Sequence, residues 1–140
     1  MFTAFPLLAI PALFYNLFAL TAVVGGKAAQ AGADLKATLF PVTMPGGRGW
    51  DVSSGDLFIL LGLIMLFFEL LRATNTNKVA IINHSLSLIL FIFCLVEFLL
   101  IPGFATSTFF LITVMTLLDV LAGFIVTIVA ARKDFEFTGN

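Results

Sequence analysis

The chain has 140 residues, of which 61% are hydrophobic and 11% are charged, and its net charge is −1. A typical soluble domain carries about 25% charged residues, so this composition excludes an ordinary soluble fold and indicates a single-domain integral membrane protein. The near-neutral charge excludes the basic surface that a nucleic-acid partner would require. Cys94 is the single cysteine, which excludes an intrachain disulfide and a site built from several thiolates, and we interpret it as a small buried apolar residue.

Four long apolar stretches occupy most of the chain: Ala4 to Gly25, Asp56 to Ala73, Val79 to Ile101 and Ser107 to Ala131. Each is close to the roughly 20 residues that a helix needs to cross the hydrocarbon of a bilayer. Backbone in lipid must satisfy its own hydrogen bonds, which favours helices over open strands. We therefore predict an all-α fold, an integral membrane four-helix bundle with a small extramembrane loop or hairpin between the first and second spans.

The first stretch has one alternative interpretation, a cleaved signal peptide. Ala28 to Ala31 has the small residues of a cleavage site, but no Lys or Arg precedes Lys27. The apolar run is also longer than the usual core of a signal peptide. We interpret it as a retained first span.

The loop from Lys27 to Ser54 is the largest element that we expect outside the bilayer. Its Ala-rich first part predicts a short helix or an extension of span one. Two short extended runs around Pro45, Gly46 and Gly47 then predict a small hairpin cap. Trp50 suits the aromatic belt at a membrane interface. Arg48 and Trp50 are therefore candidate binding residues, although we favour an ordered lid that is anchored by its Trp.

Small and polar residues recur at helical spacing within each span, and this pattern predicts which faces meet in the bundle. The spacing alternates between three and four residues, which is typical of a left-handed bundle. The stripes are Ala9, Ala12, Asn16, Ala19 and Val23 in span one, Gly55, Gly62 and Glu69 in span two, Asn83, Ser87, Leu90, Cys94 and Glu97 in span three, and Ile112, Thr116, Asp119, Gly123 and Thr127 in span four.

Four ionisable residues are expected near the ends of the spans. Glu69 precedes Arg72 by three residues, so the two can form an ion pair at the level of the headgroups. His84 enters span three at a similar depth, where it can be a satisfied interfacial residue or a proton relay with Glu69. Glu97 lies near the other end of span three, close to the surface.

Asp119 differs because it falls at the middle of span four, where a charged side chain is costly. No basic residue is within reach on its own helix, so we expect a neutral, protonated carboxyl group. Its candidate partners are Asn16, which lies near the middle of span one, and Thr116; Tyr15 is expected to point elsewhere. The favoured interpretation is a hydrogen bond that fixes helix register, and the alternative is a proton-carrying group.

Basic residues predict the orientation. Arg72, Lys78, Arg132 and Lys133 lie close to span ends on one side, whereas Lys27, Lys36 and Arg48 are spread along the long loop. Compact clusters beside the membrane carry most weight in the positive-inside rule. We therefore expect both termini to be cytoplasmic, in the cytoplasmic (inner) membrane of a bacterium.

The C-terminal half resembles a group of uncharacterised small four-span inner-membrane proteins of alphaproteobacteria. The segments that carry the resemblance are Asn83 to Ser87, Val96 to Leu99, Pro102 to Phe110 and Ala122 to Asp134. The resemblance implies an inner-membrane location and no particular activity.

Two functional hypotheses follow. The first, which the sequence narrowly favours, is a non-catalytic accessory or assembly subunit of a larger inner-membrane complex. The second is an oligomeric proton-linked transporter or channel that uses Asp119, with Asn16, Glu69, His84 and Glu97 at other depths. No catalytic, cofactor or metal-binding pattern is recognised, so we predict a non-enzyme without a cofactor. The expected partners are the lipid bilayer and a membrane protein or further copies of the chain.

Overall fold

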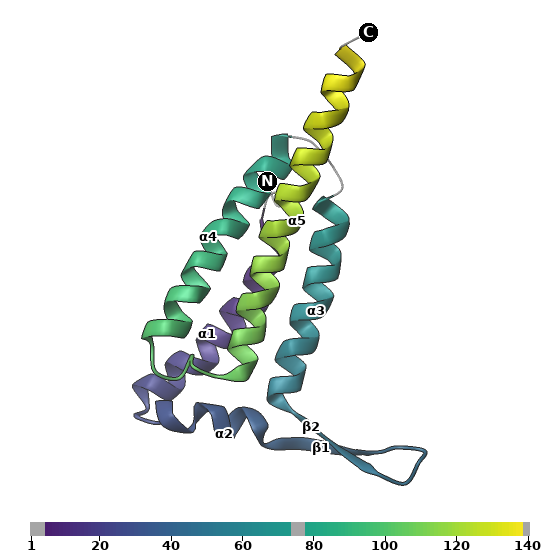
Figure 1. The fold of residues 1–140 in the computed structure, drawn as a ribbon. Coiled ribbons are helices and arrows are strands. Elements are labelled where there is room, and N and C mark those ends of the chain that lie inside the picture. Colours follow the sequence, from purple (N-terminus) through teal and green to yellow (C-terminus); the bar gives the residue numbers. More distant parts are fainter. Residues whose placement is uncertain (1–4, 74–77, 139–140) are drawn as a thin grey trace.

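The computed structural model describes residues 5–73 and 78–138 and shows a mostly helical protein with one small hairpin (Figure 1). Its elements, in chain order, are α1 (Ala9–Val24), the short 3₁₀ helix η2 (Ala28–Gln30), α2 (Ala31–Lys36), β1 (Thr38–Thr43), β2 (Gly49–Ser53), α3 (Ser54–Ala73), α4 (Lys78–Leu100) and α5 (Ser107–Thr138). The expected turn at residues 74–77 lies outside the described residues.

Within residues 5–73 and 78–138, three helices are long and apolar enough to cross a membrane, namely the segments Ser54–Arg72, Ile82–Leu100 and Ser107–Val129. Their length and composition identify a multi-pass membrane protein. The predicted first span, residues 4–25, is only partly confirmed, because α1 is apolar but has 16 residues instead of the expected 22. Residue 4 lies outside the described residues. In contrast, α5 continues past the predicted end at 131 and has 32 residues.

The late start of α1 has a local cause. Pro6 disfavours helical backbone in the residue before it, so the chain enters the helix through a turn at Leu7 and Leu8. Pro11 lies in the first helical turn, where its missing N–H group costs no intrahelical bond. The other end of α1 is followed by Gly26, whose φ of 70° favours glycine.

The extramembrane segment contains both predicted elements. The Ala-rich part forms η2 and α2, a separate short helix rather than an extension of α1. β1 and β2 pair antiparallel, with an irregularity between Thr38 and Phe40. Figure 1 shows the hairpin extending sideways from the bundle, across the direction of α3, so it does not cover the helix ends as a lid would.

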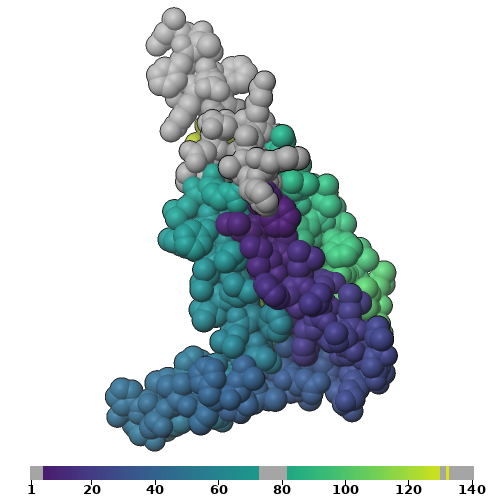
Figure 2. All heavy atoms as spheres, turned by 180° about the vertical axis from the view of Figure 1, so that it is seen from behind, coloured from purple at the N-terminus to yellow at the C-terminus, as the bar shows by residue number. Residues whose placement is uncertain are grey.

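α5 is the central helix of the bundle. It packs against both α3 and α4 and also contacts α1. In its membrane-length segment 44% of the residues are buried, compared with 22% in each of the corresponding segments of α3 and α4. In Figure 2, which shows the side opposite to Figure 1, α1 (purple) lies between α3 (teal) and α4 (green).

The predicted inward faces are largely confirmed. Gly55, Gly62 and Glu69 of α3 are all buried, and so are four of the five stripe residues in each of α4 and α5. The exception in α5 is Thr127, which is exposed because it lies near the end of the spanning segment. Tyr15 was expected to point elsewhere, but its side chain is fully buried in an aromatic cluster with Phe104 and Phe109.

Side-chain caps fix the start of α3. Ser53 accepts a hydrogen bond from the Asp56 N–H (3.2 Å), and the Asp56 carboxylate accepts one from the Ser53 N–H (2.9 Å). This reciprocal pair is a capping box, which satisfies donors that a helix N-terminus leaves free. It explains why α3 begins at Ser54, two residues before the predicted span.

Candidate functional site

Glu69 is the centre of a buried polar cluster at the end of the bundle where α3 ends and α1 begins. The Glu69 side chain is fully buried. Its Oε2 atom accepts hydrogen bonds from the Leu7 backbone N–H (2.8 Å) and from the Arg72 guanidinium (3.4 Å). Its Oε1 atom accepts a hydrogen bond from the Asn83 side-chain amide. The carboxylate therefore joins α1, α3 and α4.

The contact with Leu7 explains how α1 begins in an apolar environment. A helix N-terminus leaves backbone N–H groups without acceptors and carries a partial positive charge, which an anionic group stabilises. Here the anionic group comes from α3, because the residue before α1 supplies no side-chain cap. Arg72 completes the connection by donating to the Phe5 carbonyl (3.1 Å).

The predicted pair between Glu69 and Arg72 is confirmed, with an N···O distance of 3.4 Å. The environment differs from the prediction, because Glu69 is buried in the bundle rather than placed among solvated headgroups. The Arg72 side chain keeps 29% of its surface exposed. The pair therefore connects the buried cluster to the end surface of the bundle.

Asp119 of α5 faces the same cluster and is fully buried. Ser87 is close enough to be a hydrogen-bond partner of its carboxyl group, and Glu69, His84 and Arg72 are the ionisable groups nearby. Neither carboxyl oxygen, however, makes a hydrogen bond of acceptable geometry with any described residue. An isolated buried carboxylate is very costly in an apolar environment, so the neutral, protonated form is favoured.

The imidazole of His84 lies against Gly123, one helical turn beyond Asp119. A Cβ atom at Gly123 would be 2.2 Å from His84 Nδ1, so only glycine leaves room for the ring. The same close approach holds α4 and α5 together at the level of the cluster. Small residues at helix contacts permit such an approach in membranes.

The buried side-chain atoms without a hydrogen-bond partner among the described residues all belong to this one cluster. They are Asn83 Oδ1, His84 Nδ1, Ser87 Oγ and both carboxyl oxygens of Asp119. Buried polar groups usually have partners, because leaving one unpaired costs about 1–3 kcal/mol. Their concentration between α4 and α5 marks this region as the candidate functional site.

The predicted partners of Asp119 are wrong. The Asn16 amide donates instead to the Ala12 carbonyl (3.1 Å) and to Glu97 Oε2 (3.0 Å). The Thr116 hydroxyl donates to the Thr113 carbonyl of its own helix (2.7 Å). Glu97 was expected close to the surface, but it is only 4% exposed and bonds to Asn16 inside the bundle.

The depth of Asn16 explains this difference. The neighbouring Tyr15 hydroxyl donates to the Gly103 carbonyl (3.2 Å) and contacts Thr106 Oγ1 (2.5 Å), immediately before α5 begins. Asn16 therefore lies near the start of α5, whereas Asp119 lies about 18 Å further along that helix at 1.5 Å per residue. The two residues are at different levels of the bundle.

The geometry limits what this cluster can bind. Among the described residues, no group of three or more His, Cys, Asp or Glu side chains is arranged to hold a metal ion. Cys94 is fully buried, in agreement with its interpretation as a small core residue.

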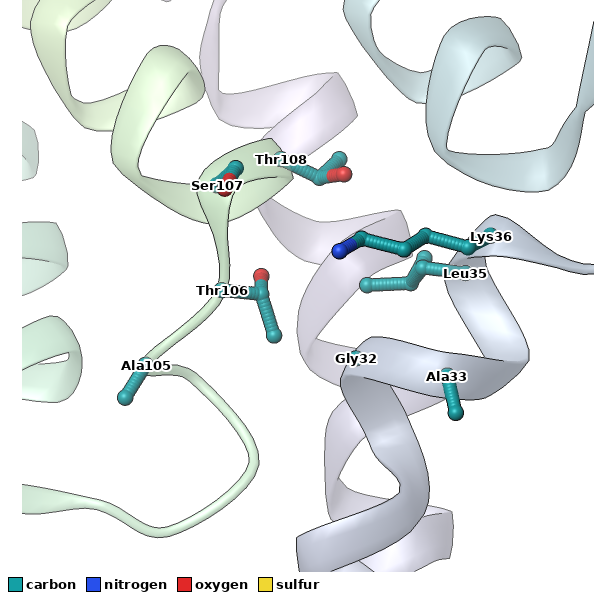
Figure 3. A pocket seen from close by; sticks show the side chains of 8 residues that line it. All are labelled: Gly32, Ala33, Leu35, Lys36, Ala105, Thr106, Ser107 and Thr108. Atoms are coloured by element: carbon teal, nitrogen blue, oxygen red, sulfur yellow. The ribbon is translucent and has the colours of Figure 1, made fainter.

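A separate pocket lies at the other end of the bundle, between α2 and the start of α5 (Figure 3). Its volume is about 340 Å³, and it combines the Lys36 ammonium group with hydroxyl groups. The lining residues are Gly32, Ala33, Leu35, Lys36, Ala105, Thr106, Ser107 and Thr108. It shares no residue with the polar cluster, and the two other candidate residues, Arg48 and Trp50, lie on the hairpin outside it.

No family model matches the chain, and no curated protein or solved structure matches it. The resemblance to small inner-membrane proteins of alphaproteobacteria therefore stays a prediction.

Proposed function

We propose that this multi-span membrane protein is a small proton-linked transporter or channel in which Asp119 binds the proton. The observation that supports the proposal most is the concentration of unpartnered buried polar atoms around Asp119. Ionisable residues inside a membrane are costly and commonly mark pathways for ions or protons. Of the two partners predicted from the sequence, Asn16 donates to Glu97 and Thr116 donates to the Thr113 carbonyl, so Ser87 is the hydroxyl group left beside the Asp119 carboxyl group.

The arrangement suggests a direction of access. Arg72 is partly exposed and contacts Glu69, and both Glu69 and His84 act on Asp119. Protons would therefore reach Asp119 from the bundle end that contains Arg72. Towards the opposite end, α4 and α5 meet through the buried apolar residues Cys94 and Ile112, with Leu90 packed against them. Release of the proton on that side would require α4 and α5 to rearrange, as in an alternating-access mechanism.

Proton uptake into proteoliposomes tests this proposal. Wild-type protein should take up protons under an imposed proton gradient. Asp119→Asn should abolish this uptake, because an amide keeps the shape of the side chain but cannot bind and release a proton under these conditions. Glu97→Gln is the matched control, since it removes another buried carboxyl group at a different level. Uptake by the wild type that persists in Asp119→Asn would contradict the proposal.

We propose the cytoplasmic membrane of a bacterium as the location, with both termini in the cytoplasm. The support is the position of Arg72, Lys78, Arg132 and Lys133 beside the ends of apolar helices. α3 ends and α4 begins at the same end of the bundle as the C-terminal end of α5, which supports placing these residues on one side of the membrane. The bilayer and further copies of the chain are the proposed partners of the transporter.

An accessory subunit of a larger membrane complex is the second candidate. One observation favours it: α5 extends well beyond the other helices at its C-terminal end and offers a helical segment outside the bundle (Figure 1). Extraction in a gentle detergent separates the candidates. Migration with a large complex, together with no proton uptake by the wild type, would favour the accessory subunit, whereas a discrete small homo-oligomer would favour the transporter.

A further inference from the structure

The register of the hairpin gives it one apolar face and one polar face. Phe40 pairs with Val52, and Val42 pairs with Trp50. Directly paired residues project from the same face of a sheet, so these four side chains form a single apolar face. The alternate pairs, Pro41 with Asp51 and Thr43 with Gly49, project from the opposite face. We call the set Phe40, Val42, Trp50 and Val52 the apolar hairpin face.

Two of the four side chains of the apolar hairpin face are exposed, and Val42 is partly buried. Val52, next to α3, is only 5% exposed, but Phe40 is 48% and Trp50 is 49% exposed. A single two-stranded hairpin is marginally stable in water and needs a surface on which to pack its apolar face. The hairpin extends away from the helices, so the bundle itself does not provide that surface beyond Val52 (Figures 1 and 2).

The location of the hairpin indicates what covers this face. It leaves the bundle where α3 begins and runs across the direction of that helix, which is the direction of a membrane surface if α3 crosses the bilayer (Figure 1). The first turns of α3 expose Leu57 (42%) and Leu60 (53%), so the lipid-facing surface continues from α3 towards the hairpin. Basic residues stand at both ends of the hairpin, with exposed Lys36 before β1 and exposed Arg48 in the turn.

We propose that the hairpin is a membrane anchor whose apolar face lies on the bilayer surface, at the boundary between headgroups and acyl chains. Trp has a large apolar ring with a polar N–H group and is enriched at this depth. Arg48 in the turn is placed to contact lipid phosphates, while Asp51 on the opposite face remains in water. The anchor fixes the level of α3 in the membrane and is independent of proton binding by Asp119.

Trp50 makes this proposal directly testable, because it is the only tryptophan in the chain. Its fluorescence is measured in lipid nanodiscs, which leave both membrane faces accessible, with lipids brominated close to the headgroup and with unbrominated lipids. The brominated lipids should remove most of the Trp50 emission, whereas acrylamide dissolved in the water should quench it weakly. Neither measurement needs a substitution that could prevent folding.

Three results would overturn the proposal. Quenching by acrylamide that exceeds quenching by brominated lipid would place the hairpin in water. Protection of Trp50 from both quenchers would show that protein, such as a second copy of this chain, covers the apolar hairpin face. Phe40→Ser should reduce quenching by brominated lipid, and Asp51→Asn on the opposite face should leave it unchanged; equal effects of the two substitutions would also contradict the assignment.

Discussion

The contact between His84 and Gly123 predicts a stability difference between two similar substitutions. A Cβ atom at position 123 would be 2.2 Å from His84 Nδ1, whereas ordinary contact begins at 3.4 Å, so the ring would have to move by the difference, 1.2 Å. Overpacking of this kind costs about 1–3 kcal/mol. Replacing a helical glycine with alanine also stabilises the helix by about 1 kcal/mol, which offsets part of this cost. We therefore expect Gly123→Ala to lower the free energy of unfolding by about 0–2 kcal/mol.

Gly62→Ala is the matched control, because it adds the same methyl group to another buried helical glycine. Its Cβ atom would meet Met115 Sδ at 2.7 Å, but the long thioether side chain adapts easily. Gly62→Ala should therefore be neutral or slightly stabilising. Steric trapping in bicelles measures the free energy of unfolding of each variant. Proton uptake then reports whether the displaced His84 disturbs the site. If Gly123→Ala proved as stable as Gly62→Ala and transported normally, the argument from this contact would be wrong.

Three further predictions concern the buried hydrogen bonds and the topology. Glu69 accepts three hydrogen bonds and Glu97 accepts one, and each such bond in a membrane contributes about 0.6 kcal/mol. Glu69→Leu should therefore lower the free energy of unfolding by about 2 kcal/mol, and Glu97→Leu by about 0.6 kcal/mol. Equal losses in a denaturant titration would refute this ranking. Tyr15→Phe removes the hydroxyl that joins α1 to the loop before α5 and should cost about 1 kcal/mol in the same titration, and an unchanged midpoint would mean that the bonds do not contribute. Cysteines placed at Thr43 and Thr138 in an otherwise cysteine-free chain should be labelled from the periplasm and the cytoplasm respectively, and the reverse pattern would invert the topology.

Local sequence patterns were sufficient to predict the apolar helices and their inward faces. Asn83, Ser87 and Glu97 were placed on one face of α4 from spacing alone, and all three are buried. This succeeds because side chains three or four residues apart share a face of any α-helix, whatever it packs against. The hairpin was predictable for a similar reason, since Gly46 and Gly47 follow a proline between two short extended runs.

The start of α1 was harder to predict because it combines a local signal, Pro6, with a contact to Glu69, which is distant in the sequence. The apolar run alone suggested a span of usual length beginning at residue 4. In the structure, the helix begins after the turn that follows Pro6, and Glu69 accepts the hydrogen bond of the Leu7 N–H at that turn. The sequence shows the proline but does not show which acceptor will be beside the helix terminus.

Composition and periodicity by themselves determined the membrane character of this protein, the number of its apolar helical segments and most of the residues that face inward, because these properties depend on local hydrophobicity and helix geometry. Only the tertiary structure decided which polar residues meet. Asn16 and Asp119 both looked central when counted along their own spans, yet Asn16 bonds to Glu97 and Asp119 faces Ser87 and His84. The relative depth of two helices is set by their contacts with their neighbours, such as Tyr15 with the loop before α5, and a one-dimensional count along each span contains no information about it.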